Sequence, residues 1–252
     1  MRSARTWMFV PGANRRQMEK ALLLPADALI FDLEDAVAGG EKENARKQVK
    51  GVLQRNVAPG SPARYVRING ADTPYFEDDV REVAEAGLDG IVLPKVEGPE
   101  QVHLLEKRLE QVSHPKPGER VVEIVPIIES ACGLYRACEI AGASRRIRRL
   151  LFGAIDFALD IGAELTKDGL ELLYARSQLV VVSRAAGIEA PIDSVFPDLQ
   201  DETGLVREAR MARQLGFQGK LLIHPKQIEP VNRVFAPSGG ELAEAREIVA
   251  AY

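Results

Sequence analysis

Charged residues stand at the end of most of the short apolar runs in this sequence. They are Asp32, Glu34, Asp35, Arg67, Lys95, Glu129, Asp156, Asp193, His224 and Lys226. Charged groups are rarely buried unless they are paired or ligated. If the apolar runs are the strands of one parallel barrel, their carboxyl ends meet at a single mouth, where enzymes of that architecture carry their sites. The pattern therefore predicts a polar pocket, although any single member could instead form a structural ion pair or cap a helix.

Two of these carboxylates, Glu129 and Asp156, follow the fifth and sixth apolar runs and would lie on neighbouring strands. Apposed carboxylates repel each other unless a proton or a cation lies between them. No histidine or cysteine cluster accompanies them, so the ligands would all be oxygen atoms, which favours Mg²⁺ over zinc. We predict that Glu129 and Asp156 hold one Mg²⁺, with water and substrate oxygens at the remaining positions.

Arg67 and Lys95 are the cations of the predicted mouth. The planar fork of Arg67 suits bidentate binding of a substrate carboxylate. Glu34 or Asp35 could pair with Arg67 instead, and sequence spacing does not separate the two interpretations. Lys95 could form a Schiff base if it were desolvated, but the nearby acidic segment that begins at Asp32 favours a protonated, paired lysine.

The elements that must position these residues alternate along the whole chain. Eight apolar, β-branched runs predict strands at Trp7 to Val10, Ala28 to Leu33, Tyr65 to Ile68, Gly90 to Leu93, Glu123 to Ile128, Leu150 to Ile155, Pro191 to Val195 and Lys220 to Ile223. Amphipathic stretches predict helices at Asn14 to Leu24, Glu41 to Gln54, Tyr75 to Ala86, Gln101 to Gln111, Leu170 to Ala186 and Thr203 to Leu215. Eight such units in 252 residues favour a single-domain (β/α)8 TIM barrel over residues 1–252. No glycine-rich nucleotide motif supports an open doubly wound sheet.

Composition excludes several other classes of protein. The chain is 46% hydrophobic and 28% charged, with a net charge of -4, so it is neither disordered nor globally basic. We expect no nucleic-acid partner, and no apolar run reaches the roughly 20 residues of a membrane span. Cys132 and Cys138 match neither a zinc nor a redox motif, and we expect two buried free thiols and a cytoplasmic location.

Seven segments together resemble the group of the HpcH/HpaI aldolase superfamily that contains citrate lyase β subunits and malyl-CoA and citramalyl-CoA lyases. The matching segments are Phe9 to Gly12, Phe31 to Val37, Val66 to Asn69, Leu93 to Lys95, Pro126 to Ser130, Gly153 to Phe157 and Pro191 to Asp193. They occur in the family's order through most of the chain, so the resemblance is specific.

The resemblance implies a TIM barrel that assembles as a homotrimer or larger oligomer, with Mg²⁺ on Glu129 and Asp156 and a 2-oxo acid carboxylate on Arg67. It further implies coenzyme A binding by basic residues of the first βα unit, where Arg16 and Lys20 lie four residues apart. Both could equally be ordinary helix-surface residues. Asp32, Glu34 and Asp35 are similar to an acidic family motif that organises Arg67, Lys95 and metal-bound water.

The implied activity is a carbon–carbon lyase that cleaves or forms a 3-hydroxyacyl thioester such as citryl-, malyl- or citramalyl-CoA, with an acetyl thioester and a 2-oxo acid as products. A citrate lyase version would use an acyl-carrier thioester and two further subunits, α and γ. The alternatives are an acyl-CoA thioesterase on the same scaffold, or a non-catalytic protein that binds CoA thioesters or oxo acids.

One feature of the resembled family is not matched. Its members carry a Gly-x-Met-Ile-Asp-like motif beyond the eighth βα unit, and its Asp reaches a neighbouring subunit's site as acid or base. The sequence up to Tyr252 contains no such motif. We therefore expect either that a further segment supplies this group or that the protein lacks it, in which case Asp32, Glu34 and His224 are the next candidates.

Overall fold

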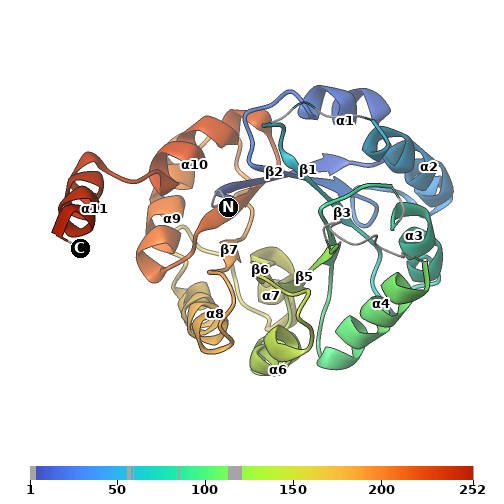
Figure 1. The fold of residues 1–252 in the computed structure, drawn as a ribbon. Helices are drawn as coiled ribbons and strands as arrows, with labels where there is room; N and C mark the ends of the chain where they lie inside the picture. Colours follow the sequence, from blue (N-terminus) through green and yellow to red (C-terminus); the bar gives the residue numbers. More distant parts are fainter. Residues whose placement is uncertain (1–3, 56–57, 59, 85, 113–120, 252) are drawn as a thin grey trace.

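Eight parallel strands form a closed barrel in chain order, from β1 to β8, which confirms the predicted TIM barrel (Figure 1). The structure is a computed structural model that describes residues 4–55, 58, 60–84, 86–112 and 121–251. The strands are β1 (Thr6–Pro11), β2 (Ala28–Asp32), β3 (Ala63–Arg67), β4 (Gly90–Leu93), β5 (Glu123–Ile128), β6 (Leu151–Phe152), β7 (Ile192–Asp193) and β8 (Gly219–Leu222). All eight predicted strands therefore exist, and β6 and β7 are shorter than expected.

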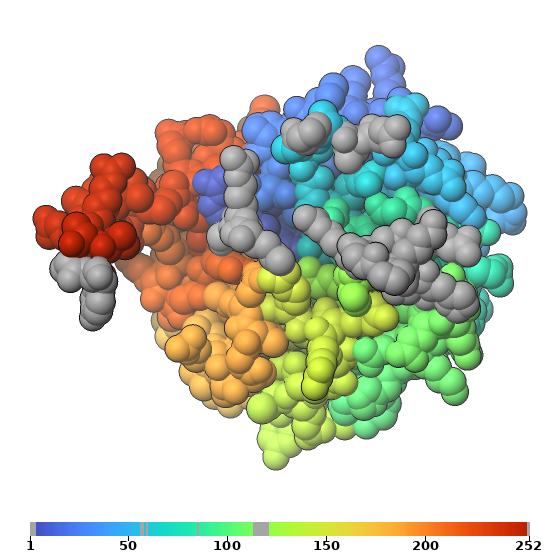
Figure 2. All heavy atoms as spheres, in the orientation of Figure 1, coloured from blue at the N-terminus to red at the C-terminus, as the bar shows by residue number. Residues whose placement is uncertain are grey.

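Helices surround the barrel as an outer layer (Figure 1). They are α1 (Arg15–Ala21), α2 (Lys42–Leu53), α3 (Phe76–Val83), α4 (Pro99–Val112), α5 (Ala131–Tyr135), α6 (Ala137–Gly142), α7 (Ala154–Asp160), α8 (Leu173–Ala185), α9 (Glu202–Leu215), α10 (Ile228–Phe235) and α11 (Gly239–Ala251), with short 3-10 turns η1 (Gly39–Glu41), η2 (Leu170–Leu172) and η3 (Pro225–Gln227). The six predicted helices are α1 to α4, α8 and α9. The helix α11 lies outside the ring, as the space-filling view also shows (Figure 2).

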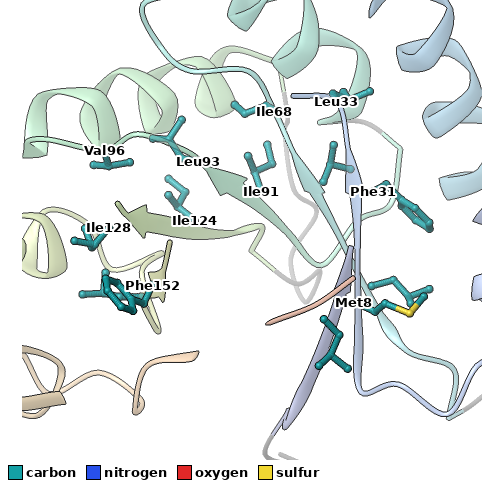
Figure 3. Close-up of a cluster of buried hydrophobic side chains, with 14 of the residues drawn as sticks. Met8, Phe31, Leu33, Ile68, Ile91, Leu93, Val96, Ile124, Ile128 and Phe152 are labelled. Carbon is teal, nitrogen blue, oxygen red and sulfur yellow. The ribbon is translucent and has the colours of Figure 1, made fainter. Parts of the chain in front are cut away.

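Strand alternation divides the apolar residues into two cores, because successive side chains point to opposite faces of a sheet. One core fills the barrel interior and contains Trp7, Ala28, Ile30, Tyr65, Val92, Val125, Ile127, Leu151, Ile192 and Leu221. The larger core lies between strands and helices, and Figure 3 shows part of it, including Met8, Phe31, Ile91 and Phe152. A residue's place in this alternation decides whether it can face the mouth of the barrel.

Asp193 shows the consequence of this alternation. Ile192 points into the barrel interior, so Asp193 points outward, where it is fully buried. Its carboxylate accepts hydrogen bonds from Arg176 Nε at 2.8 Å and Lys220 Nζ at 2.7 Å. The interpretation of Asp193 as a member of the polar mouth is therefore wrong: it forms a buried ion-pair cluster behind the barrel wall.

The sixth unit differs from its prediction in a way that matters for the site. We expected a strand from Leu150 to Ile155, but β6 ends at Phe152 and α7 begins at Ala154. Asp156 therefore lies in the first turn of a short helix rather than at a strand end. Gly153 joins β6 to this helix, and a Cβ at this position would lie only 2.5 Å from Glu129 Oε2.

The exposure of the two cysteines and the character of the helices bear on the expected environment of the protein. Cys132 and Cys138 are both exposed, so the expectation of buried thiols is wrong. Both lie on the short helices α5 and α6, which the sequence did not predict. Within the described part of the chain, no helix has the length and apolar character needed to cross a bilayer.

Candidate active site

A pocket of about 460 Å³ opens where the strands end at the carboxyl-terminal mouth of the barrel. Its polar lining residues are Asp32, Asp35, Arg67, Glu129, Asp156 and Ser194, and its apolar and small ones are Phe9, Pro11, Ala36, Ile127, Gly153, Ile155, Val195, Leu221 and Ile223. The pocket thus combines four carboxylates and one guanidinium with an apolar floor. This arrangement brings together the arginine and the two carboxylates that the sequence singled out.

Arg67 is held in place by Asp32 on the neighbouring strand. The guanidinium donates through Nε to Asp32 Oδ1 at 2.8 Å and through Nη2 to Asp32 Oδ2 at 2.6 Å. Asp32 also accepts the backbone N–H groups of Glu34 and Ala36, at 2.9 and 3.1 Å, so both its oxygens are engaged. The guanidinium carbon lies 4.8 Å from the centre of the Phe9 ring. These contacts fix the plane of the arginine fork at the mouth.

A second set of ion pairs links Arg67 to Lys95 through Glu34 and Asp35. Arg67 Nη1 lies 2.9 Å from Glu34 Oε2 and 3.3 Å from Asp35 Oδ2. Lys95 Nζ contacts Glu34 Oε1 and lies 3.7 Å from Asp35 Oδ1. Burial works to lower the pKa of Lys95, but the hydrogen bond to Glu34 and the surrounding carboxylates raise it above its usual value. Lys95 is therefore a protonated, paired lysine, which disfavours Schiff-base chemistry.

Glu129 is almost fully buried, and its hydrogen-bond partner Lys95 has an unusual backbone conformation. Its Oε1 accepts the backbone N–H of Lys95 at 2.7 Å, and Lys95 adopts a left-handed φ of 52° to present that N–H. Burial raises the pKa of Glu129 to about 8, and the charges of Glu34 and Asp156 add to the rise. A carboxyl group with such a pKa is protonated at neutral pH unless a cation stabilises its charge.

The donor set at this point fits Mg²⁺. Glu129 and Asp156 both line the pocket, and Mg²⁺ is commonly bound through one or two carboxylates while it keeps several waters. Among the described residues, no group of three or more His, Cys, Asp or Glu side chains is arranged to enclose a metal ion. The site therefore suits an ion that water and substrate help to coordinate rather than an all-protein cage.

Three other sequence candidates lie elsewhere. Arg16 and Lys20 are exposed on α1 and are not among the residues that line the pocket. His224 directly precedes the turn η3 as its N-cap, and its Nδ1 accepts the backbone N–H of Lys226 at 3.1 Å. This histidine also lies outside the pocket lining, so its observed role is that of a cap.

Three residues that shape the pocket were not predicted as site residues: Phe9 and Gly153, which the sequence analysis placed only in family-like segments, and Ser194. Gly153 lies so close to Glu129 that a Cβ atom there would be 2.5 Å from Glu129 Oε2. Ser194 is buried, and its Oγ accepts the backbone N–H of Ala154 at 2.9 Å. Side chains alternate between the two faces of a strand, so the residue after the outward-facing Asp193 is expected to face the barrel. This alternation could have predicted Ser194 as a pocket residue.

A parallel eight-stranded barrel with an acidic, arginine-bearing pocket at its carboxyl-terminal mouth defines a TIM-barrel enzyme. A family model described as HpcH/HpaI aldolase/citrate lyase matches residues 5–225, and the chain belongs to this family. The predicted family, and with it a citrate lyase β-like enzyme, is confirmed.

Relatives with assigned names cover nearly the whole chain. The citrate lyase subunit β of Leuconostoc mesenteroides subsp. cremoris is 44% identical over 99% of this chain and 82% of its own length. A (3S)-malyl-CoA thioesterase of Cereibacter sphaeroides is 38% identical over 98% of this chain and 82% of its own length. The crystal structure of protein CitE from Mycobacterium tuberculosis, in complex with magnesium, acetoacetate and coenzyme A, is 30% identical, with a TM-score of 0.78, and covers 100% of this chain and 88% of that one.

Proposed function

We propose that the protein is a Mg²⁺-dependent carbon–carbon lyase acting on a 3-hydroxyacyl thioester such as citryl-, malyl- or citramalyl-CoA. The products of cleavage are an acetyl thioester and a 2-oxo acid. The observation that carries the proposal is the presence of Glu129 and Asp156 in the same pocket as the fixed fork of Arg67. The relatives named as citrate lyase β subunits support the same reaction class.

The chemistry divides between the metal and the side chains. Mg²⁺ held by Glu129 and Asp156 would supply Lewis-acid stabilisation for the 3-hydroxyl oxygen, which becomes the carbonyl oxygen of the 2-oxo acid. Arg67, with its plane set by Asp32, would hold the substrate carboxylate and thereby orient the bond to be broken. In cleavage the 3-hydroxyl loses its proton, the C2–C3 bond breaks, and its electron pair passes to the thioester enolate, which then takes up a proton at C2.

The apolar part of the pocket has a role in the same scheme. Phe9, Ile127 and Leu221 line it together with the charged groups. Apolar walls limit the number of water molecules around an enolate and strengthen the electrostatic interactions that stabilise it. They also provide contact surface for the acetyl part of the thioester.

Thioester hydrolysis is the alternative that a specific observation favours, since one relative at 38% identity is named a (3S)-malyl-CoA thioesterase. The same carboxylates and arginine would then orient a substrate whose thioester carbon is attacked by water. A protein that binds the thioester or the oxo acid without turnover is the third candidate.

One experiment separates the three. Purified protein is incubated with Mg²⁺ and malyl-, citramalyl- or citryl-CoA, and 2-oxo acid, acetyl-CoA and free thiol are measured together. A lyase releases oxo acid and acetyl-CoA in equal amounts without free thiol. A thioesterase releases free CoA and no oxo acid, and binding without any product identifies the third candidate. The Glu129→Gln variant is the control for turnover at this site.

Partners are proposed on the same basis. The family resemblance supports a homotrimer or larger assembly, and for citrate lyase an acyl-carrier thioester together with α and γ subunits. Arg16 and Lys20 are proposed contacts for the coenzyme A phosphates, since both are exposed basic residues on one face of α1. Light scattering of the purified chain, alone and with candidate subunits, tests the assembly.

A further inference from the structure

The helix α7, which carries Asp156, is anchored at its first residue by a side chain that directly follows the strand β7. The Ala154 N–H donates to Ser194 Oγ at 2.9 Å. Gly153, which precedes the helix, has no side chain and cannot cap it. Ser194 directly follows β7 and is only 1% exposed. The start of α7 is therefore fixed to the end of β7 by a single buried hydroxyl group.

The last residue of α7 is anchored on the opposite side. Asp160 Oδ2 accepts the N–H of Ala131 at 2.7 Å. Ala131 begins α5 and stands two residues after Glu129. Asp160 therefore connects the helix that carries one carboxylate of the site to the turn that carries the other.

Directly before α7, the backbone at Gly153 lies against Glu129. The Gly153 N–H donates to Ile128 O at 3.0 Å, and a Cβ at position 153 would meet Glu129 Oε2 at 2.5 Å. With seven residues, α7 makes only two turns, so its own hydrogen bonds cannot keep it rigid. Phe157 and Ala158 bury one face of the helix, and the contacts at its two ends add to this packing in setting the separation of Asp156 from Glu129.

Such anchoring matters because Mg²⁺ needs both groups as carboxylates, and two apposed carboxylates repel each other once Glu129 has lost its proton. On a loosely held helix the ion must also bring the two ligands together, which lowers its affinity. A pair whose separation is already set avoids that cost.

We propose that Ser194 and Asp160 are positioning residues that hold Asp156 at Mg²⁺-binding distance from Glu129. This inference rests on the proposed function, because it takes Glu129 and Asp156 as the residues that hold Mg²⁺. Neither Ser194 nor Asp160 needs to touch the ion. Both act through the placement of α7, so their loss changes metal affinity rather than the identity of the ligands.

Isothermal titration of the full chain with Mg²⁺ tests the inference without any turnover. We expect Ser194→Ala and Asp160→Ala each to weaken Mg²⁺ binding about 10- to 100-fold, as is typical for groups that orient metal ligands. Asp160→Asn keeps an oxygen that can accept the Ala131 N–H while removing the charge, so it should bind Mg²⁺ nearly as well as the parent.

The matched control is Asp201→Ala. Asp201 Oδ1 accepts the Gly204 N–H at 2.8 Å and caps α9, so this variant removes the same kind of hydrogen bond from a helix outside the site. We expect it to lower the melting temperature and to leave Mg²⁺ affinity unchanged. That contrast separates positioning from a general loss of stability.

Three outcomes would overturn the inference. The first is unchanged Mg²⁺ affinity in Ser194→Ala and Asp160→Ala, which leaves the proposed function intact. The second is an Asp201→Ala variant whose Mg²⁺ affinity falls to the same degree. The third is an Asp160→Asn variant that binds Mg²⁺ as weakly as Asp160→Ala, which would mean that the charge of Asp160 acts and not its hydrogen bond. If the parent protein binds no Mg²⁺, the metal site of the proposed function fails as well.

Discussion

Arg67 and Asp32 occupy paired register positions at the ends of β3 and β2, and two hydrogen bonds of 2.8 and 2.6 Å join their side chains. Strand register alone therefore brings a bidentate carboxylate to the arginine. Because Asp32 uses both its oxygens in this pairing and in two backbone contacts, its role is to fix the guanidinium rather than to move protons. Nη1 also lies beside Glu34 and Asp35, so a substrate carboxylate that binds both Nη groups must displace one of these partners.

The first prediction concerns this fork. Arg67→Lys keeps the positive charge but loses the paired N–H donors, so binding of a 2-oxo acid should weaken about 10- to 100-fold, the equivalent of roughly 1.5–3 kcal/mol for hydrogen bonds to a charged group. Calorimetric titration with oxaloacetate and pyruvate at saturating Mg²⁺ measures the change, and circular dichroism checks the fold. A Lys variant that bound oxaloacetate as tightly as the parent would make Arg67 a structural ion-pair residue only.

The second prediction concerns the two proposed ligands. Glu129→Ala and Asp156→Ala each remove one charged oxygen ligand, and Mg²⁺ affinity should fall at least tenfold in either variant. Asp168→Ala is the control, since it removes an exposed carboxylate outside the pocket. Unchanged affinity in both site variants would refute a joint site.

The third prediction follows from the pKa of Glu129, which burial raises to about 8. At pH 7 the group is mostly protonated, and Mg²⁺ binding requires the carboxylate, so each bound ion should release close to one proton. The affinity should rise with pH up to about 8 and then level off. Titration in buffers of different ionisation enthalpy measures the proton, and a buffer-independent enthalpy at pH 7 would contradict the prediction.

Without metal, the same raised pKa should make the folded protein less stable as pH rises. Glu129 favours its protonated form in the folded state, so its contribution is fully present below the ordinary pKa of glutamate and is lost as pH approaches about 8. Added Mg²⁺ should remove this loss. Urea unfolding at pH 6 and pH 8, with and without Mg²⁺, tests the sign, with Glu129→Gln as the control that lacks this contribution.

Sequence reasoning succeeded where position along a strand decides the outcome. The alternation of strands and helices indicated a barrel, and the barrel brings Arg67, Glu129 and Asp156 to one mouth. It failed where a shift of one residue along the strand decides which side chain faces the pocket, since Asp193 points outward while Ser194 faces the pocket. It also failed for short helices such as α7, whose seven residues are too few to show a clear period.

Another prediction uses the close approach at Gly153. Gly153→Ala would place a Cβ 2.5 Å from Glu129 Oε2 and 2.6 Å from Glu129 Cβ, so the buried carboxylate must move. Stability should fall by about 1–3 kcal/mol, and Mg²⁺ binding should weaken about tenfold or more. Gly51→Ala, in the interior of α2 with open space around it, is the control and should be neutral or stabilising. A Gly153→Ala variant with normal metal affinity would show that Glu129 tolerates displacement.

The last prediction separates Asp193 from the site. Asp193→Ala leaves Lys220 and Arg176 buried without the carboxylate that pairs with both, and removal of one partner from a buried ion pair costs about 3–5 kcal/mol. Glu208 contacts the same two cations, at 2.5 Å from Lys220 Nζ and 3.5 Å from Arg176 Nη2, and should soften the loss. Urea unfolding should therefore show a large drop in stability, while the protein that remains folded binds Mg²⁺ and oxo acid as the parent does. Loss of ligand binding without loss of stability would instead indicate that Asp193 belongs to the site at the mouth of the barrel.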